Sequence, residues 1–141
     1  TARTFVQNVA YALRVGGSFI ITVPDEEYLV KSRKLLGKRF GDEYHNVHFE
    51  TSEELKDFGS AYEFSFKGAV DKLKEYVVKR EVLIALCNNC GMELISSRNF
   101  SEYNSHKDTP LWSRMKVTYN QVSRIYTTYH FVMNEFTSTS D

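Results

Sequence analysis

Two aromatic residues and one carboxylate have the types and the spacing needed to hold a flat, hydrogen-bonding ligand such as a purine. Tyr62 and Phe64 stand two residues apart in an alternating segment, so on a strand both side chains lie on one face. Glu75 follows a short distance along the chain. An aromatic ring that stacks on a base contributes about 1 to 3 kcal/mol, and a carboxylate accepts hydrogen bonds from N–H groups.

The same residues also fit a simpler interpretation. A sheet face rich in aromatic side chains is common in a protein core. A glutamate is also common in the first turn of a helix, where it complements the helix dipole. Residue types alone therefore leave both the ligand site and the ordinary core open for Tyr62, Phe64 and Glu75.

The elements that would position these residues alternate between helices and strands. A first helix has Phe5, Val9, Ala12 and Leu13 on its apolar face and ends near Val15, before two glycines. The other predicted elements are a strand over 18–23, a helix from 24–27 to about 36, strands over 44–49 and 61–66, a helix over 75–89, a strand over 92–97, a helix over 111–119 and a strand over 125–136.

The strands are expected to differ in their burial. Residues 18–23 form a nearly continuous apolar and β-branched run between Gly17 and Pro24. Such a run is typical of a strand that is buried on both faces, so we expect a central parallel strand. Residues 61–66 alternate, with Tyr62, Phe64 and Phe66 on one face, and predict a partly solvent-facing hairpin with residues 44–49. Together these elements indicate an α/β fold.

A cluster of basic residues follows the predicted buried strand. The nine residues 31–39 contain five cations: Lys31, Arg33, Lys34, Lys38 and Arg39. These side chains could contact the phosphates of a nucleotide or of RNA. The alternative is a solvated helix face whose long side chains keep their charged ends in water.

Composition limits the possible partners. The 18 basic and 18 acidic side chains cancel, so any affinity for RNA has to come from a local patch. No apolar run approaches the roughly 20 residues of a membrane span, and we expect a soluble protein. Two cysteines are too few for a disulfide scaffold and indicate reduced thiols in an intracellular protein. The chain opens with Thr1 inside a predicted helix, so we expect a fragment.

A zinc site is the other chemistry that the sequence invites. Cys87, Cys90, His45 and His48 have suitable ligand types for a tetrahedral site. However, two residues three apart on a strand point to opposite faces, so His45 and His48 are not expected to bind one ion. We therefore predict no metal.

Several stretches, in the same chain order, resemble mRNA cap (guanine-N7) methyltransferases. The first group resembles the helix, Gly-Gly turn and buried strand of that family: residues 6–9, 13–14, 16–17, 19–20 and 24. The second group is similar in identity and spacing to the cap-binding half of the family: residues 40–43, 47, 49, 58–64, 70–71 and 75–76. Residues 99–103 and 125–126 extend the match, which is weakest over 104–124.

The resemblance implies the second half of a class I S-adenosylmethionine (SAM)-dependent methyltransferase (Rossmann-like) fold, with an added cap-binding hairpin. Residues 1–136 would be the C-terminal part of the catalytic domain, and residues 137–141 a disordered tail. The glycine-rich loop that binds the nucleotide part of a cofactor in such folds follows a strand, whereas Gly16 and Gly17 precede one. The resemblance thus implies that SAM is the cosubstrate and is bound mainly by residues outside this chain.

The resemblance also implies a site and a reaction. The residues that would line the cap guanosine are Pro24, Tyr62, Phe64, Glu75 and Tyr126. Glu75 would accept hydrogen bonds from guanine N1–H and the N2 amine, a pattern that adenine lacks. The reaction implied is methyl transfer from SAM to N7 of the terminal guanosine of capped RNA. Because N7 is already a nucleophile, alignment suffices and no catalytic residue is expected.

The implied partners are capped RNA, RNA polymerase and other capping enzymes, but neither a membrane nor DNA. A cellular parent protein would be nuclear, and a viral one cytoplasmic. Two other classes of function stay open. One is a noncatalytic purine-nucleotide-binding, RNA-binding or structural module that resembles a methyltransferase, and the other is a class I methyltransferase with another small substrate.

Overall fold

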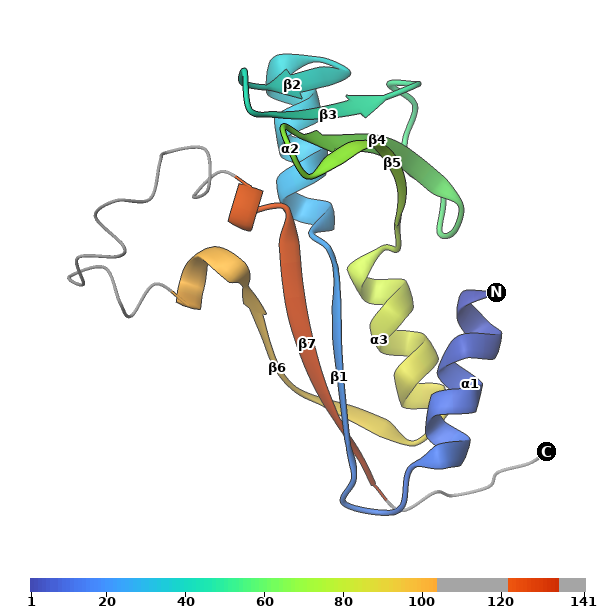
Figure 1. The fold of residues 1–141 in the computed structure, drawn as a ribbon. Helices are drawn as coiled ribbons and strands as arrows, with labels where there is room; N and C mark the ends of the chain where they lie inside the picture. The colour runs from blue at the N-terminus through green and yellow to red at the C-terminus, as the bar shows by residue number, and fades with distance from the viewer. Residues whose placement is uncertain (104–121, 135–141) are drawn as a thin grey trace, which may run out of the picture.

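The computed structural model describes residues 1–103 and 122–134, and this part of the chain is a mixed α/β protein (Figure 1). The elements are α1 Ala2–Ala12, β1 Ser18–Pro24, α2 Glu26–Leu36, β2 Arg39–Gly41, β3 His45–Phe49, β4 Ser60–Phe66, β5 Val70–Val77, α3 Arg80–Asn89, β6 Met92–Asn99, the short 3-10 helix η1 Phe100–Tyr103 and β7 Tyr126–Met133. The predicted α/β class is confirmed. The predicted helix over 111–119 and the tail over 137–141 lie outside the described residues.

The first sheet joins strands from the two ends of the described chain. Its order is β1-β7-β6, and both pairings are antiparallel. The predicted central parallel strand over 18–23 is therefore wrong for the described residues, because β1 is antiparallel, lies at the edge of this sheet and buries only Phe19. An apolar run fixes neither the direction of a strand nor its place in the sheet, and the strand that pairs with β1 is more than a hundred residues away in the sequence.

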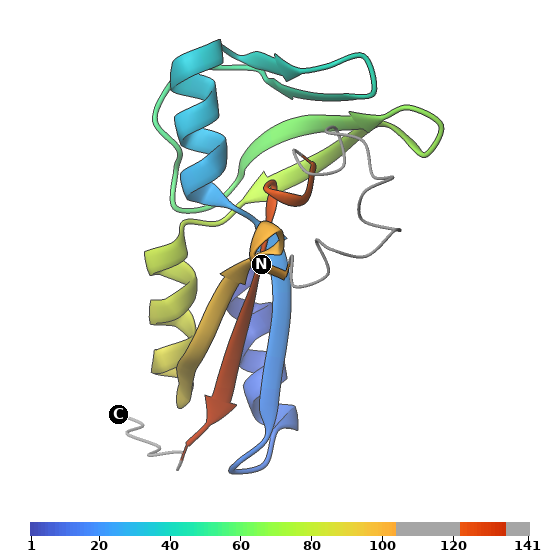
Figure 2. The same ribbon diagram turned by 90° about the vertical axis from the view of Figure 1, so that its left-hand side faces the viewer.

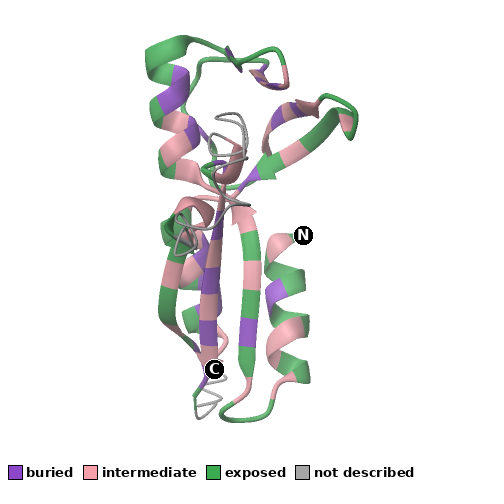
Figure 3. Ribbon diagram, turned by 60° about the vertical axis from the view of Figure 1, so that its left-hand side comes forward, coloured by how far each residue is buried: buried purple, intermediate pink, exposed green. Residues whose placement is uncertain are grey.

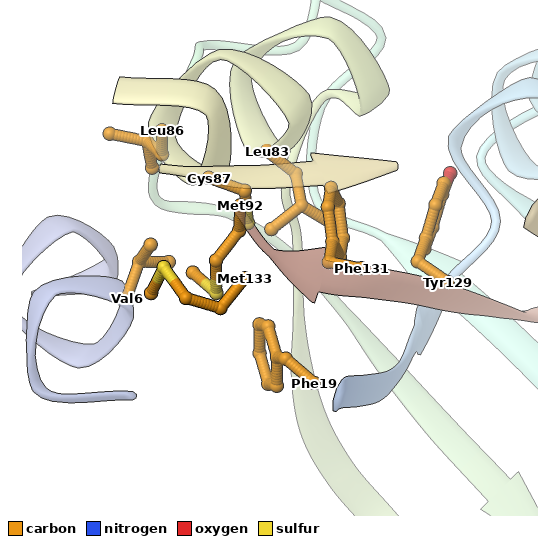
Figure 4. Packing of buried hydrophobic residues seen from close by; sticks show 9 residues of the cluster. All are labelled: Val6, Phe19, Leu83, Leu86, Cys87, Met92, Tyr129, Phe131 and Met133. Atoms are coloured by element: carbon orange, nitrogen blue, oxygen red, sulfur yellow. The ribbon is translucent and has the colours of Figure 1, made fainter. Parts of the chain in front are cut away.

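Two helices cover one face of this sheet. In Figure 1, α1 and α3 lie on the same side of β1, β6 and β7. Figure 4 shows their packing against the strands; the residues of this first core are Val6, Phe19, Leu83, Leu86, Cys87, Met92, Tyr129, Phe131 and Met133. On β7, buried residues alternate with half-buried ones, as the banding of Figure 3 shows. This alternation places every second side chain of β7 toward the helices.

The second sheet is a local meander with the order β2-β3-β4-β5 (Figure 2). The predicted hairpin is confirmed, because β3 and β4 pair antiparallel with Phe49 opposite Tyr62. The sheet packs against α2, and the residues of this second core are Leu29, Phe40, Val47, Phe49, Leu55, Tyr62, Phe64, Val77 and Ile125. Ile125 directly precedes β7, so the second core also reaches the first sheet.

Two helix boundaries differ from the prediction. The first helix ends at Ala12 and buries Val6, whereas the predicted core residue Phe5 is 52% exposed. The third helix begins at Arg80, so Glu75 lies on a strand and not in a first helical turn. Pairing with β4 and the burial of Val77 decide this segment, and neither contact is visible in a local sequence window.

Carboxylates cap the starts of α2 and α3. The Oδ1 atom of Asp25 accepts a hydrogen bond of 2.9 Å from the backbone N–H of Tyr28, in the predicted first turn of α2. Lys79 makes no side-chain capping bond for α3, but the Oε1 atom of Glu26 accepts one of 2.9 Å from the backbone N–H of Arg80. The N-termini of the two helices are therefore tied together between the sheets.

Candidate functional site

Glu75 receives a hydrogen bond from the neighbouring strand of the second sheet. It stands opposite Tyr62 in the register of β4 and β5, so the two side chains lie on the same face. The Tyr62 hydroxyl donates to the Oε2 atom of Glu75. Two of the three residues that the sequence analysis selected for their chemistry, Tyr62 and Glu75, are thus in direct contact.

The first sheet supplies a second donor to the same carboxylate. Tyr126 begins β7, and its hydroxyl lies 2.7 Å from Oε1 and 2.9 Å from Oε2 of Glu75. Glu75 therefore joins residues of both sheets, although Tyr126 is 51 positions away in the sequence. An ionised carboxylate has about four acceptor sites, so the two hydroxyls do not use the full acceptor capacity of Glu75.

Pro24 and Phe64 complete this group. Pro24 is the register partner of Tyr126 across β1 and β7. The ring of Phe64 meets the ring of Tyr126 edge to face, with centroids 6.4 Å apart. The structure thus brings together the residues predicted to line one site: Pro24, Tyr62, Phe64, Glu75 and Tyr126.

The members of this group differ in exposure. Tyr62 is 1% exposed and Phe64 is 6% exposed, whereas Pro24, Glu75 and Tyr126 are half-buried. The ring of Tyr62 packs on Phe49, with centroids 5.4 Å apart. The rings of the aromatic pair belong to the second core, as the simpler interpretation predicted, while the Tyr62 hydroxyl donates to Glu75. Contact of this pair with a ligand stays a prediction. A ligand would reach the half-buried residues first.

The two hydroxyl groups are held in their neutral, donating form. Burial raises the pKa of Tyr62, and the hydrogen bond and negative charge of Glu75 raise it further. The pKa of Tyr126 is raised for the same reasons, burial first. Two neutral donors aimed at one carboxylate fix its orientation and leave it as an acceptor.

The predicted basic patch does not act as one group. Arg33 is 8% exposed and donates to the backbone oxygens of Thr51 and Glu53, at 3.2 and 2.9 Å, with its guanidinium 4.9 Å from the centre of the Phe49 ring. This residue serves the fold. Arg39 is exposed and lies 3.3 Å from the Nδ1 atom of His48. The exposed lysines of the patch are Lys31, Lys34 and Lys38.

The four residues considered for zinc take part in different contacts. His45 is buried on the inner face of β3 with its Nδ1 atom 3.1 Å from Asp42, and His48 lies on the other face, as the spacing predicted. Cys87 is buried in the first core, and burial raises the pKa of its thiol to about 12. Among the described residues there is no group of three or more side chains that could hold a metal ion.

Sequence reasoning missed a polar cluster beside the site. Asp25 accepts hydrogen bonds from the Thr127 hydroxyl and from the Asn99 side-chain amide. Asp25 was expected only to lie at the start of a helix, Asn99 was noted only as part of the family match, and Thr127 was not singled out. Asn99 and Thr127 come from β6 and β7, and Asp25 directly follows β1, so only the sheet order could have predicted their meeting.

The chain is similar to a known protein family. The model of the mRNA (guanine-N(7))-methyltransferase domain matches residues 1–134. The chain belongs to this family. The predicted resemblance is therefore confirmed.

Individual relatives agree with the family match. The chain is 32% identical over 111 residues to the mRNA cap guanine-N(7) methyltransferase of Meyerozyma guilliermondii, which covers 71% of this chain and 19% of that protein. It is 31% identical over 121 residues to the Drosophila melanogaster protein of the same name, covering 81% of this chain and 28% of the relative. The chain thus spans less than a third of the length of these relatives.

Solved structures were matched at lower identity. A SAM-dependent methyltransferase from Clostridium acetobutylicum matches with a TM-score of 0.45 and 15% identity, over 94% of this chain and 50% of that one. The CcbJ methyltransferase from Streptomyces caelestis matches with a TM-score of 0.47 and 11% identity, over 93% and 52%. In the described part of this member of the cap methyltransferase family, no helix is long and apolar enough to cross a membrane.

Proposed function

We propose that this chain forms the guanosine-binding part of an mRNA cap guanine-N7 methyltransferase. The enzyme would transfer a methyl group from SAM to N7 of the terminal guanosine of capped RNA. The observation that carries the proposal is the Glu75 carboxylate, held by the hydroxyls of Tyr62 and Tyr126 between the two sheets. Membership of the family supports the same reaction.

The chemistry of Glu75 favours guanine over adenine. Guanine presents two donors, N1–H and the N2 amine, on the edge that faces away from N7, and a carboxylate accepts both in parallel. Adenine has an acceptor at N1 and would leave one oxygen of Glu75 without a partner, which costs binding free energy. The aromatic rings of Phe64 and Tyr126 and the ring of Pro24 would contact the base and its surroundings.

The reaction asks little acid–base chemistry of these residues. Guanine N7 carries a lone pair and loses no proton during methylation, so alignment with the methyl donor is the main requirement. SAM would supply the methyl group on its positively charged sulfonium. A negative carboxylate on the far edge of the base would also favour the positive charge that develops on the ring.

SAM itself is proposed to bind outside this group of residues. A glycine-rich turn between a strand and the following helix is the usual cradle for a nucleotide-containing cofactor. Among the described residues, Asp25 alone connects β1 to α2, and this connection contains no glycine. We therefore assign this chain the guanosine contact and assign no SAM contact to it.

Exposed cations on α2 and directly after it would supply the contact with RNA. Lys31, Lys34, Lys38 and Arg39 are exposed, and they could meet phosphates of the triphosphate bridge or of the RNA. Binding through such contacts weakens as salt concentration rises. RNA polymerase and other capping enzymes are the further partners that this function implies, and a nuclear location follows for a cellular protein.

The test is methyl transfer from labelled SAM to guanosine-capped RNA by the full-length protein that contains this chain. Replacing Glu75→Gln puts an amide donor against the donors of guanine, so we expect transfer at limiting RNA to fall about a hundredfold or more. Glu63→Gln is the matched control, because Glu63 lies on the adjacent strand β4 but pairs across from Lys74 on the other face.

Each other outcome would contradict a different part of the proposal. Equal activity of Glu75→Gln and Glu63→Gln would remove Glu75 from the site. SAM binding without methylation of capped RNA would indicate a methyltransferase with another substrate. Binding of capped RNA without any transfer would indicate a noncatalytic module.

A further inference from the structure

A second polar cluster lies next to the proposed guanosine site in the chain and in space. The Oδ2 atom of Asp25 accepts hydrogen bonds from the Thr127 hydroxyl, at 2.5 Å, and from the Nδ2 atom of Asn99, at 2.9 Å. Asp25 follows Pro24, and Thr127 follows Tyr126. We call Asp25, Asn99 and Thr127 the anchor.

The anchor also holds the backbone on both sides of the site. Pro24 has no N–H group to donate across the sheet, and the next donor, the Asp25 N–H, binds the Ile125 carbonyl at 2.6 Å. The Nδ2 atom of Asn99 donates to the Arg124 carbonyl at 2.8 Å as well. The two residues before Tyr126 are therefore fixed to the anchor.

The orientation of the Asn99 amide is itself determined. Its Oδ1 atom accepts from the backbone N–H of Ser101 at 3.0 Å and from the Ser101 hydroxyl at 2.6 Å. The amide must then turn its NH₂ group toward Asp25 and Arg124. Thr127 is 6% exposed, so water competes little for its bond to the carboxylate.

The anchor residues do not belong to the face that carries the site. Thr127 is adjacent to Tyr126 on β7, so the two side chains point to opposite faces of the first sheet. The other oxygen of Asp25, Oδ1, accepts the hydrogen bond that caps α2. Contact with the guanine edge is left to Glu75 on β5.

We propose that Asp25, Asn99 and Thr127 are positioning residues that hold Pro24 and Tyr126 against Glu75, and thereby set the affinity of the guanosine site. This inference rests on the proposed function. Without the anchor, β1 and β7 keep their register, but the ends of the two strands beside Glu75 lose the side-chain bonds that join them to β6.

The first test uses Asp25→Asn in the full-length protein. Asparagine retains an oxygen that can cap α2, but it turns an NH₂ group toward the donors of Asn99 and Thr127. We expect the Kd for the dinucleotide GpppA, a guanosine joined to adenosine by a triphosphate bridge, to rise about tenfold, the scale of one lost hydrogen bond to a charged group. The Kd for SAM should stay unchanged.

The second test removes one hydroxyl at a time. Thr127→Val deletes the donor to Asp25 while nearly keeping its shape, and we expect the Kd for GpppA to rise several-fold. Thr128→Val is the matched control, because Thr128 is the next residue on β7 and its hydroxyl pairs with the Thr22 hydroxyl at 3.3 Å instead of with Asp25. It should bind GpppA as the unchanged protein does.

The third test exchanges the pair. In Asn99→Asp alone, two carboxylates face each other, and binding of GpppA should weaken about as much as in Asp25→Asn. In the double variant Asp25→Asn, Asn99→Asp, the new amide can donate to the new carboxylate. We expect affinity to recover relative to both single variants, a rescue that separates a specific pair from general damage.

The outcomes distinguish this inference from the proposed function. If Glu75→Gln binds GpppA as well as the unchanged protein does, the guanosine site itself is wrong. If Glu75→Gln binds weakly while Asp25→Asn and Thr127→Val bind normally, only the anchor is wrong. Equal weakening of GpppA and SAM binding in the anchor variants, without rescue in the exchange, would also overturn it, because the residues would then serve general stability.

Discussion

The two cores of this protein bury different kinds of side chain. The first core, beneath α1 and α3, is built from aliphatic, aromatic and sulfur-containing residues. The second core, beneath α2, lies beside buried polar groups, among them Ser32, Arg33 and His45, and beside the carboxylate of Glu75. The difference indicates that the first region is stabilised by apolar packing, whereas the second also holds polar side chains in fixed positions.

The polar groups of the second region are tolerated because each has partners. Arg33 donates to two backbone carbonyls, and the Tyr62 hydroxyl donates to Glu75. A buried polar group that lost its partner would cost about 1 to 3 kcal/mol. The second region therefore depends on specific pairs of atoms, whereas the first depends on filled volume.

The largest effect should come from the first core. Phe131 is completely buried on β7 and packs against Phe19 and Tyr129. Phe131→Ala should lower the free energy of unfolding by about 3 to 5 kcal/mol, because it leaves a cavity. Chemical denaturation measures this change. Val132→Ala, on the opposite face of the same strand, should cost less than about 1.5 kcal/mol. Equal losses of stability in the two variants would contradict a difference in burial between the two faces of β7.

A smaller effect should separate two cations of α2. Arg33→Gln removes the guanidinium from two backbone oxygens and should lower the free energy of unfolding by about 2 kcal/mol. Lys34 is exposed on the same helix, and Lys34→Gln should change stability by no more than about 0.5 kcal/mol. Salt-dependent RNA binding should respond in the opposite order, with Lys34→Gln reducing it. Similar stability for both variants would contradict a structural role for Arg33.

The smallest effect is the loss of stability in alkali, and it distinguishes the cores by pH. The pKa of Cys87, in the first core, is raised from 9.0 to about 12, and that of Tyr62, in the second, is raised above its ordinary value of 10.0. The unfolded chain therefore releases these protons at lower pH than the folded chain does. Stability is complete below pH 9 as far as these groups are concerned, and falls as pH rises toward the folded-state pKa values.

Denaturation as a function of pH tests this order. Each raised group should contribute a slope of about 1.4 kcal/mol per pH unit. Cys87→Ala should flatten the fall between about pH 9 and 10, and Tyr62→Phe should reduce it only above about pH 10. A fall between about pH 9 and 10 that Cys87→Ala leaves unchanged would assign the alkaline sensitivity to other groups.

Local patterns in the sequence predicted much of the fold. The alternation of Tyr62, Phe64 and Phe66 gave a strand that pairs with β3, and Asp25 marked the start of α2. These predictions succeeded because strand alternation and helix capping depend on residues close together in the chain. The family resemblance then selected five site residues from positions 24 to 126, and the structure brings them together.

Predictions that needed a distant partner failed. The direction of β1 depends on β7, and the strand that carries Glu75 depends on β4 and on the burial of Val77. Arg33 looked like one of five solvent-facing cations until the loop carrying Thr51 and Glu53 was seen to close over it. In each case a long-range contact overrides the local preference of the segment.

The sequence by itself determined the positions of most helices and strands and the residue types of the proposed guanosine site, because periodicity, caps and residue chemistry are local properties. Only the tertiary structure decided how the site is held. The bond from Tyr126 to Glu75 joins β7 to β5, and the anchor of Asp25, Asn99 and Thr127 joins β6 and β7 to the residue that follows β1. Such contacts arise from the order and register of the sheets, which depend on burial summed over the whole fold.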